Sequence, residues 1–250
     1  IAITNCLNFG DPNDPEVYWQ FSKAVEGISL ACKHLNTPVT GGNVSFYNET
    51  SKNAVYPTPV IGMVGILEDV KHATSISFKN KNNLIVAVGS LNPTLGGSEY
   101  LQYLYGKCEG PISNIDLDVE SNVQSMVLEL IQNNFICSAH DLSDGGLIVN
   151  ILESLINSNK SLGAHINITS KLRNDELLFG ECQSVIIVSI KEKYLHELAL
   201  AAQKHNVHTQ TIGKVTDDAK IIVNDIIDCD REKIEYIYNS QLKDILTNEN

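Results

Sequence analysis

The segment of residues 38–48, PVTGGNVSFYN, limits the fold of this chain more than any other. Two β-prone runs flank the consecutive glycines Gly41 and Gly42, and glycines let backbone N–H groups approach a large anion such as phosphate. Asn43 and Ser45 stand two residues apart, so in an extended strand their side chains point to the same side. The segment predicts a strand that presents an amide and a hydroxyl to a nucleotide and its metal. A Gly-Gly hairpin with solvent-facing polar residues is the alternative.

The composition suits a globular protein. The 250 residues allow one large domain or two modest ones, and 43% hydrophobic residues are ordinary for a chain with a sizeable core. A formal net charge of −12 argues against a nucleic-acid-binding surface. No apolar run approaches the ~20 residues that span a bilayer, and Ile1–Gly10 lacks the features of a signal peptide. We therefore expect a cytoplasmic protein that binds neither nucleic acid nor membrane.

Hydrophobic periodicity predicts strands and helices along the whole chain. A helix begins where Asp14 can cap and Pro15 fits the first helical position, and it ends near Asn36 because Pro38 disfavours helix before it. The first three strands are predicted at Ile1–Thr4, around the glycine pair, and at Pro59–Leu67, which reads as mostly buried.

A polar stretch over residues 71–83 marks a domain boundary. Beyond it, strands are predicted at residues 84–89, 135–138, 164–169, 184–190, 210–215 and 220–223. Helices are predicted at residues 98–105, 116–133, 145–157, 175–179, 191–206 and 232–246. This mixture indicates an α+β or mixed α/β fold with helices on one or both faces of a sheet.

The segment HDLSDGGL, residues 140–147, combines a histidine, two carboxylates and a Gly-Gly pair that opens a helix. One interpretation is a phosphate site at a helix N-terminus, where Asp141 and Asp144 could hold Mg²⁺. The alternative is a structural turn in which Ser143 or Asp144 caps the helix. His140 also forms a lone C-x-x-H with Cys137, without the second ligand pair that a zinc site needs.

Three further segments could line a cleft. Asn5 and Asn8 follow the first strand and could hydrogen-bond a base or a ribose, although an Asn-rich turn explains them as well. A second Gly-Gly pair, Gly96 and Gly97, precedes a helix. The segment GECQ, residues 180–183, precedes a buried strand.

Taken in this order, the motifs resemble the phosphoribosylformylglycinamidine synthase family, in the C-terminal half of its large synthetase subunit. This family belongs to the aminoimidazole ribonucleotide synthetase-like superfamily. The matching segments are TNCLNFG (4–10), PEVYWQF (15–21), TPVTGGNVSFYNE (37–49), PTPVIG (57–62), LGGSEY (95–100) and HDLSDGGL (140–147). The resemblance is strongest over residues 4–67 and weakest after about residue 190.

The resemblance implies a ligase of purine biosynthesis. In that family ATP phosphorylates the amide oxygen of formylglycinamide ribonucleotide, and ammonia from a glutaminase then displaces phosphate. The implied fold is a partial A domain, truncated at its start, over residues 1–75, followed by a B domain with a mixed sheet covered by helices over residues 84–250. The implied partners are the N-terminal half of the same polypeptide, a glutaminase subunit and a small accessory subunit.

Motif by motif, the resemblance also implies site residues. Asn5 and Gly42 would contact ATP, Asn43 would ligate Mg²⁺ and Ser45 would contact the ribonucleotide. The carboxylates for this metal and the catalytic histidines would lie in the first half of the polypeptide. The resemblance further implies a pseudo-symmetric site, with His140, Asp141, Asp144, Glu181 and Gln183 near it. Cys182 stands there where the substrate-binding version of the motif has Ser, which argues against substrate binding at this copy.

The chain has no initiator Met and opens on a strand, so we expect a piece of a longer protein that is inactive alone. Two alternatives remain. The chain could be a catalytically incomplete half that holds a nucleotide and serves as an assembly module. It could also belong to a related enzyme of the aminoimidazole ribonucleotide synthetase type, which the segment NCLNFG matches less well.

Overall fold

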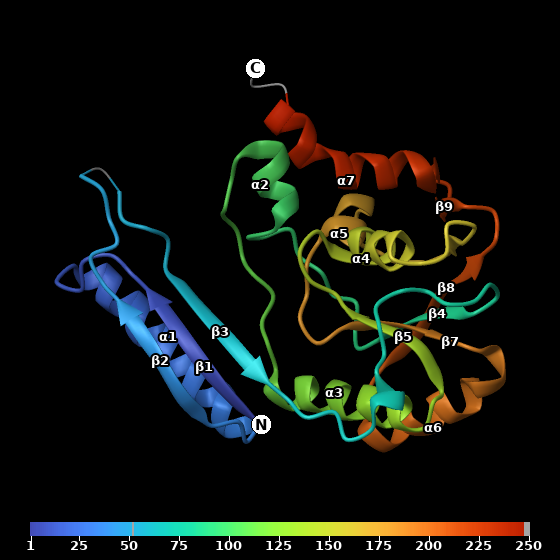
Figure 1. Ribbon diagram of the computed structural model, residues 1–250, viewed down its shortest axis with the longest axis horizontal. Helices are drawn as coiled ribbons and strands as arrows, with labels where there is room; N and C mark the ends of the chain where they lie inside the picture. Colours follow the sequence, from blue (N-terminus) through green and yellow to red (C-terminus); the bar gives the residue numbers. More distant parts are fainter. Residues whose placement is uncertain (52, 248–250) are drawn as a thin grey trace. The chain divides into compact units, whose positions relative to one another are not determined.

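A computed structural model describes residues 1–51 and 53–247 of the chain. The chain forms two compact units, Ile1–Val70 and Lys71–Asn250, which are coloured blue to cyan and cyan to red in Figure 1. Each unit has its own sheet and its own hydrophobic core. The assignment of residues 1–75 and 84–250 to an A-type and a B-type domain stays a prediction.

Unit 1 is a three-stranded sheet with one helix. Its elements are β1 (Ala2–Asn8), α1 (Pro15–His34), β2 (Val39–Ser45) and β3 (Thr58–Val64), and the strand order is β2-β1-β3. β1 pairs in parallel with β2 and antiparallel with β3. The α1 helix starts as predicted, because the Asp14 side chain accepts a hydrogen bond from the Glu16 N–H at 2.8 Å and Pro15 follows it. Leu7, Phe9 and Val17 form the core between the sheet and the helix.

One alternative and one expectation for unit 1 are wrong. Gly41 and Gly42 do not form a hairpin, because β2 runs through them and pairs with β1 on both sides of a register shift at Thr40. β3 is exposed at every residue and is therefore not a mostly buried strand; Met63, for example, is 63% exposed. An apolar run shows only that a strand is suited to burial. Within unit 1, β3 is an edge strand and the described residues leave it uncovered.

Unit 2 is built on a seven-stranded mixed sheet of order β10-β9-β6-β8-β4-β7-β5. Its strands are β4 (Leu84–Val88), β5 (Ile136–Asp141), β6 (Gly163–Ile166), β7 (Ile186–Ile190), β8 (Thr209–Thr216), β9 (Lys220–Val223) and β10 (Ile227–Asp230). Its helices are α2 (Glu99–Tyr105), α3 (Leu117–Gln132), α4 (Gly146–Ile156), α5 (Asn174–Phe179), α6 (Leu195–His205) and α7 (Arg231–Thr247), and the short 3₁₀ turns are η1 (Val70–His72) and η2 (Glu192–Tyr194). Among the strands described in unit 2, only β6 and β9 pair in parallel.

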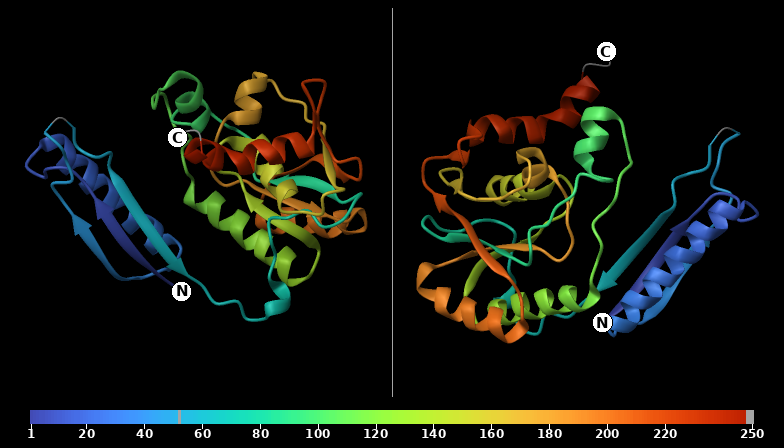
Figure 2. Two further views of the ribbon diagram at one scale, coloured as in Figure 1. Left: turned by 45° about the horizontal axis from the view of Figure 1, so that its top comes forward. Right: turned by 180° about the vertical axis from the view of Figure 1, so that it is seen from behind.

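Helices cover both faces of this sheet, as the mixed fold class predicts. In the interior strand β4, Ile85 and Ala87 join the core under α4 and α5, whereas Val86 and Val88 join the core under α3 and α6. Strand side chains alternate between faces, so a strand buried on both sides is apolar throughout. Figures 1 and 2 show α4, α5 and α7 on one side of the sheet and α3 and α6 on the other.

Two elements of unit 2 differ from the expectation. The predicted helix over residues 191–206 divides into η2 and α6. Strand β10 was not predicted; it is only four residues long and alternates apolar residues with aspartates. It forms because it pairs with β9, and a pairing partner cannot be read from four residues of local sequence.

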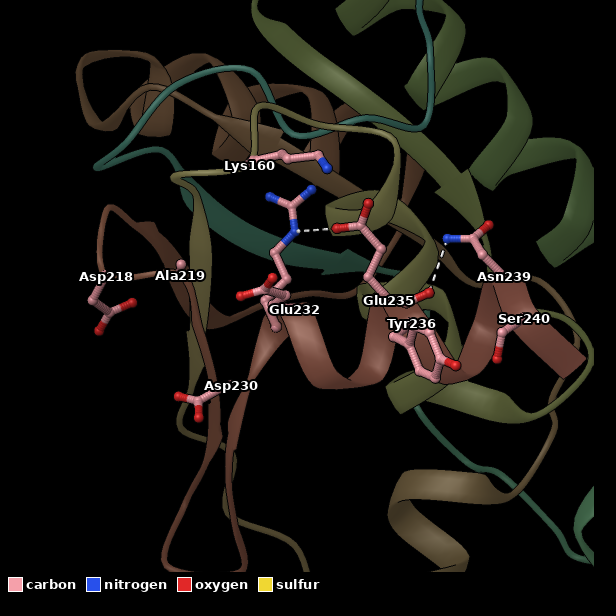
Figure 3. A pocket seen from close by; sticks show the side chains of 10 residues that line it. Lys160, Asp218, Ala219, Asp230, Glu232, Glu235, Tyr236, Asn239 and Ser240 are labelled. Atoms are coloured by element: carbon pink, nitrogen blue, oxygen red, sulfur yellow. Dashed lines mark hydrogen bonds and ion pairs between the residues drawn. The ribbon is translucent and has the colours of Figure 1, made fainter.

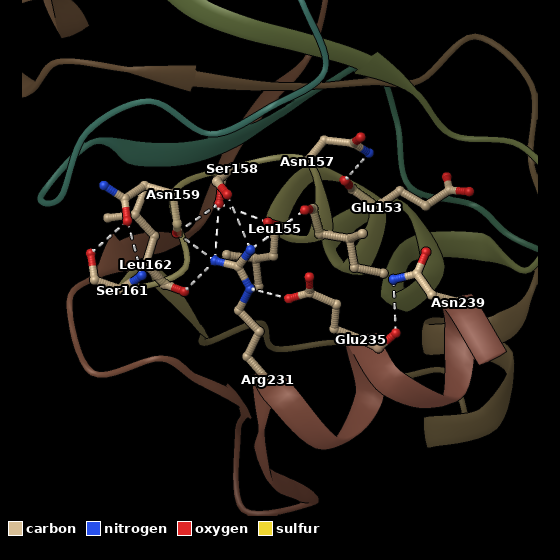
Figure 4. A network of polar contacts seen from close by, with 11 residues as sticks. Glu153, Leu155, Asn157, Ser158, Asn159, Ser161, Leu162, Arg231, Glu235 and Asn239 are labelled. Atoms are coloured by element: carbon tan, nitrogen blue, oxygen red, sulfur yellow. Dashed lines mark hydrogen bonds and ion pairs between the residues drawn. The ribbon is translucent and has the colours of Figure 1, made fainter.

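A buried arginine fastens α7 to the rest of unit 2. Arg231 is 1% exposed, and its guanidinium donates to the carbonyl oxygens of Asn159 and Leu162 at 2.5 and 3.1 Å. It also contacts Ser158 through both the hydroxyl and the carbonyl oxygen, each at 3.2 Å. Glu235, one turn along α7, lies 3.5 Å from the guanidinium (Figure 4). Burial lowers the pKa of Arg231, and these acceptors offset the loss of water around the charge.

A carboxylate joins α3 to α6 on the opposite face. Glu129 of α3 accepts hydrogen bonds from Lys204 at 2.6 Å and from His205 at 2.7 Å. The His205 side chain is only 16% exposed because it packs into this contact. The hydrogen bonds from Lys204 and then His205 lower the pKa of Glu129.

The Glu129 contact predicts an acid-sensitive contribution to stability. A carboxyl whose pKa is lowered by folding stabilises the protein above its unfolded pKa, here near 4.5, and this contribution disappears as the pH falls through the folded pKa. We expect Glu129→Gln to lower the urea midpoint at neutral pH, with a difference from the wild type that shrinks below pH ~4.5. Glu192→Gln, at an exposed position of η2, is the control. A difference that stays constant down to pH 3 would contradict this interpretation.

Candidate functional site

Asn5 and Gly42 lie directly against each other in unit 1. The parallel register of β1 and β2 pairs the two residues. A Cβ atom built on Gly42 would lie 2.2 Å from Asn5 Oδ1 and 2.6 Å from the Asn5 carbonyl oxygen. Nothing lies within 4 Å of a Cβ atom built on Gly41. The glycine requirement therefore belongs to Gly42, which must leave room for the amide of Asn5.

Asn43 and Ser45 are neighbours on β2, as the spacing predicts. The Asn43 side-chain amide donates to Ser45 Oγ at 3.4 Å. Asn48, in the following loop, donates to the Ser45 carbonyl oxygen at 2.8 Å. Asn43 is exposed and Ser45 is partly exposed, so the carbonyl oxygen of Asn43 and the hydroxyl of Ser45 are open to a ligand.

The two pairs occupy opposite faces of the sheet. Asn5 stands between Ile3 and Leu7, whose side chains are buried towards α1, so strand alternation puts Asn5 on the same face. Asn43 follows Gly42 and pairs with Cys6, so its side chain projects to the other face. Because β2 lies at the edge of the sheet, a ligand at that edge can meet both pairs and the outward N–H groups of the strand.

These residues fit a magnesium site only in part. Mg²⁺ binds oxygen ligands and usually takes one or two carboxylates together with phosphate oxygens and water. Asn43 supplies one neutral oxygen. Across residues 1–51 and 53–247, no group of three or more His, Cys, Asp or Glu side chains could hold a metal ion. Asn43 therefore does not complete a magnesium site by itself.

In unit 2 the segment of residues 140–147 connects the end of β5 to α4. His140 Nε2 lies 2.9 Å from Glu153 Oε2 on α4, and the Tyr238 hydroxyl on α7 donates to the other Glu153 oxygen at 2.9 Å. A carboxylate only accepts, so the His140 ring donates through Nε2. Glu153 raises the pKa of Tyr238. Glu153 and Tyr238 lie 13 and 98 residues from His140 in sequence, and no local motif predicts these contacts.

Glu181 brings the two Gly-Gly segments of unit 2 together. Its Oε1 atom accepts from the Gly145 N–H at 3.0 Å and from the Glu99 N–H at 2.9 Å. The Glu181 backbone also pairs with Thr94, ahead of the first Gly-Gly segment. One carboxylate oxygen thus serves the starts of both α4 and α2.

The alternative interpretation, a turn in which Ser143 or Asp144 caps α4, is therefore wrong. The N-cap residue is Gly145, in a left-handed conformation with φ of 77°, and no side chain caps it locally. Ser143 and Asp144 are exposed instead, because Glu181, distant in sequence, supplies the acceptor. The predicted phosphate site at this N-terminus already holds an internal carboxylate.

Gln183 lies in a neighbouring hollow of about 280 Å³, together with Cys182 and Ser184. Burial raises the pKa of the Cys182 thiol to about 11, so this thiol is un-ionised at neutral pH and is a poor nucleophile. Ser184 donates to Glu120 of α3 at 2.7 Å. This hollow is not lined by His140, Asp141 or Asp144. The structure therefore brings Glu181 to the segment of residues 140–147, whereas Gln183 lies beside a separate hollow.

A larger cavity of about 690 Å³ runs along α7 and contains none of the predicted site residues. Four carboxylates line it, from Asp218, Asp230, Glu232 and Glu235 (Figure 3). Asp218 already accepts from His165 and Thr216 at 2.6 and 2.7 Å.

Among the residues described, no helix is both long and apolar enough to cross a membrane.

Sequence comparison defines the class of this fold. Residues 1–67 match the family described as AIR synthase related protein, N-terminal domain, and residues 80–226 match AIR synthase related protein, C-terminal domain. The second match alone covers more than half of the chain. The chain therefore belongs to the AIR synthase related proteins.

Within this family the chain is similar to phosphoribosylformylglycinamidine synthase subunit PurL. It is 43% identical to the protein of that name from Alkaliphilus metalliredigens over 86% of this chain, and 45% identical to the one from Moorella thermoacetica over 86% of this chain. Each match covers only 29% of the relative. The chain thus spans less than a third of the length of these two relatives.

Solved structures share the fold at low sequence identity. PurL of Thermotoga maritima complexed with FGAR superimposes with a TM-score of 0.72 and 17% identity, covering 94% of this chain and 39% of that one. The same protein complexed with ATP gives a TM-score of 0.68 at 16% identity, covering 94% and 37%. The structure of PurLQS from Thermotoga maritima gives 0.69 at 16% identity, covering 94% and 38%.

The contact between Asn5 and Gly42 predicts a sharp difference between two adjacent glycines. We expect Gly42→Ala to destabilise unit 1 by about 2–4 kcal/mol, because its Cβ would overlap the Asn5 backbone and side chain. Gly41→Ala should change the free energy of unfolding by less than ~1 kcal/mol, since its Cβ meets open space. Hydrogen exchange of the unit 1 amides measures the free energy of unfolding of both variants. Equal effects of the two substitutions would rule out the proposed close approach.

The shared acceptor on Glu181 predicts coupled behaviour of two distant amides. Glu181→Ala removes the partner of both the Glu99 and the Gly145 N–H groups, so their exchange rates should rise together by about tenfold or more. Glu176→Ala on α5 is the control and should leave both amides unchanged. The contact is disproved if only one of the two amides responds to the loss of Glu181.

Proposed function

We propose that this chain is part of an ATP-dependent ligase of de novo purine biosynthesis. The reaction would convert formylglycinamide ribonucleotide, ammonia derived from glutamine and ATP to formylglycinamidine ribonucleotide, ADP and phosphate. The observation that carries the proposal is 43–45% identity to PurL subunits over 86% of the chain. The complexes of Thermotoga maritima PurL with ATP and with FGAR support both substrates.

The arrangement on β1 and β2 supports specific roles in this reaction. Asn5 and the backbone of Gly42 would bind ATP at the edge of the sheet, where bare N–H groups suit phosphate oxygens. Asn43 would supply one neutral ligand to Mg²⁺, and Ser45 would hydrogen-bond the ribonucleotide. Bound ATP supplies the phosphoryl group that activates the amide oxygen. These residues would contribute by alignment and charge neutralisation, which dominate phosphoryl transfer.

The acids and bases that complete this cleft would come from the N-terminal half of the same polypeptide. This proposal agrees with the lack of a carboxylate cluster among the described residues and with the small share of each relative that the chain covers. Residues 1–75 would then form the second A domain and residues 84–250 the second B domain. A glutaminase subunit and a small accessory subunit would supply ammonia in the cytoplasm, and the assembly named PurLQS supports such partners.

A non-catalytic role for the pseudo-symmetric site is the second candidate. His140, Asp141, Asp144, Glu181 and Gln183 would lie near a nucleotide that is held and not consumed. The Gly145 N–H already bonds to Glu181, which favours a structural site over one that turns over substrate. The chain would then act mainly as an assembly module and not as a catalytic one.

An ammonia-dependent assay tests the proposed function. In the full-length protein, ADP release should require formylglycinamide ribonucleotide, and Ser45→Ala should lower kcat/KM by about 10–100-fold through the lost substrate hydrogen bond. Asn43→Asp should also lower the rate, because it changes the charge at the metal. Ser22→Ala, at an exposed position of α1, is the matched control for Ser45→Ala.

The isolated chain should show no turnover under the same conditions. Undiminished activity of the Asn43 and Ser45 variants would contradict the site assignment. Turnover by the isolated chain would contradict the shared active site.

A further inference from the structure

A cavity of about 490 Å³ lies in unit 2 between α3 and α6, where β4 ends and β8 begins. Small residues leave this space open. Gly89 cannot carry a side chain, because a Cβ there would lie 2.1 Å from the Ser184 carbonyl oxygen, and its φ of 107° is unfavourable for other residues. Ser90 and Ala202 line the same cavity. The volume falls in the range of small-molecule sites.

A contact between α3 and α6 holds together the two helices that form the walls of the cavity. Lys204 and His205, at the C-terminal end of α6, both bond to Glu129 of α3. The next residues, Asn206 to His208, then turn into β8 along the cavity. The ion pair thus fixes α6 against α3, and the Lys204 ammonium group remains paired with Glu129.

The lining combines an apolar floor with uncommitted polar groups. Val123 and Val207 are buried at the floor, at 1% and 9% exposure. The polar side chains are those of Ser90, Gln203, Asn206 and His208. Within the described residues, no hydrogen bond or ion pair of these four side chains is found. All four residues are exposed to solvent at the mouth of the cavity. An apolar surface with a few polar groups is typical of a ligand site.

The charge of the lining limits the ligand. Among the described residues, no Asp, Glu, Lys or Arg lines this cavity. A phosphate group would find no lysine or arginine there, on a chain of formal net charge −12. Side-chain amides such as those of Gln203 and Asn206 pair with the edge of adenine through two hydrogen bonds, and imidazole rings stack on bases.

We propose that this cavity binds an uncharged nucleobase or nucleoside of the adenine type. The base would lie on the valine floor, with its polar edge towards Gln203 and Asn206 and with His208 against its face. This binding goes beyond the proposed ligase function and does not depend on it.

Titration of the full 250-residue chain with adenosine, followed by backbone amide NMR, tests the proposal. Saturable shifts should centre on Gly89, Ser90 and residues 203–208, with a Kd on the order of 100 μM for a ligand of this size. AMP should bind the same residues at least ~10-fold more weakly, because its phosphate meets no lysine or arginine.

Two variants and a control complete the test. Ala202→Phe fills the cavity and should abolish the shifts, whereas Ala199→Phe, at an exposed position of the same helix, should leave them intact. Gln203→Ala, which removes an exposed side chain and preserves the core, should weaken binding by ~10-fold. The proposal is overturned by shifts confined to residues 5 and 41–45, by AMP binding as tightly as adenosine, or by adenosine binding that survives both Ala202→Phe and Gln203→Ala.

Discussion

The parallel pairing of β1 with β2 is the constraint on which the candidate site of unit 1 depends. The α1 helix returns the chain so that the two strands run side by side in the same direction, and this register sets Asn5 against Gly42. A slip by one residue would turn every side chain of β2 to the other face. The positions of Asn43 and Ser45 thus follow from the same pairing as the packing of Leu7 under α1.

Local sequence predicted those features that local chemistry determines. The start of α1 at Asp14-Pro15 and the shared face of Asn43 and Ser45 are examples, because capping and strand alternation act over a few residues. The mixed fold class also followed from the order of apolar runs. The resemblance to a known family added what periodicity could not, namely an expected role for each motif, and these roles stay predictions.

The errors arose wherever a distant partner decides the outcome. Ser143 and Asp144 are good capping residues. The hydrogen bond at the start of α4 is nevertheless accepted by Glu181, which is distant in sequence. The apolar run in β3 indicated burial, although nothing in the described chain covers it. Contacts such as Glu153 with Tyr238 join residues 85 positions apart. Such contacts depend on tertiary packing and leave no signature in a short window of sequence.

The buried guanidinium of Arg231 makes β10 and α7 part of the packed structure of unit 2. The match to the C-terminal family domain stops at residue 226, before β10 and α7 begin. A protein cut at that residue would leave the carbonyl oxygens of the 156–162 turn without their donor and strip Ile234 from the core beneath α4. The family match and the packed part of unit 2 therefore end at different residues of this chain.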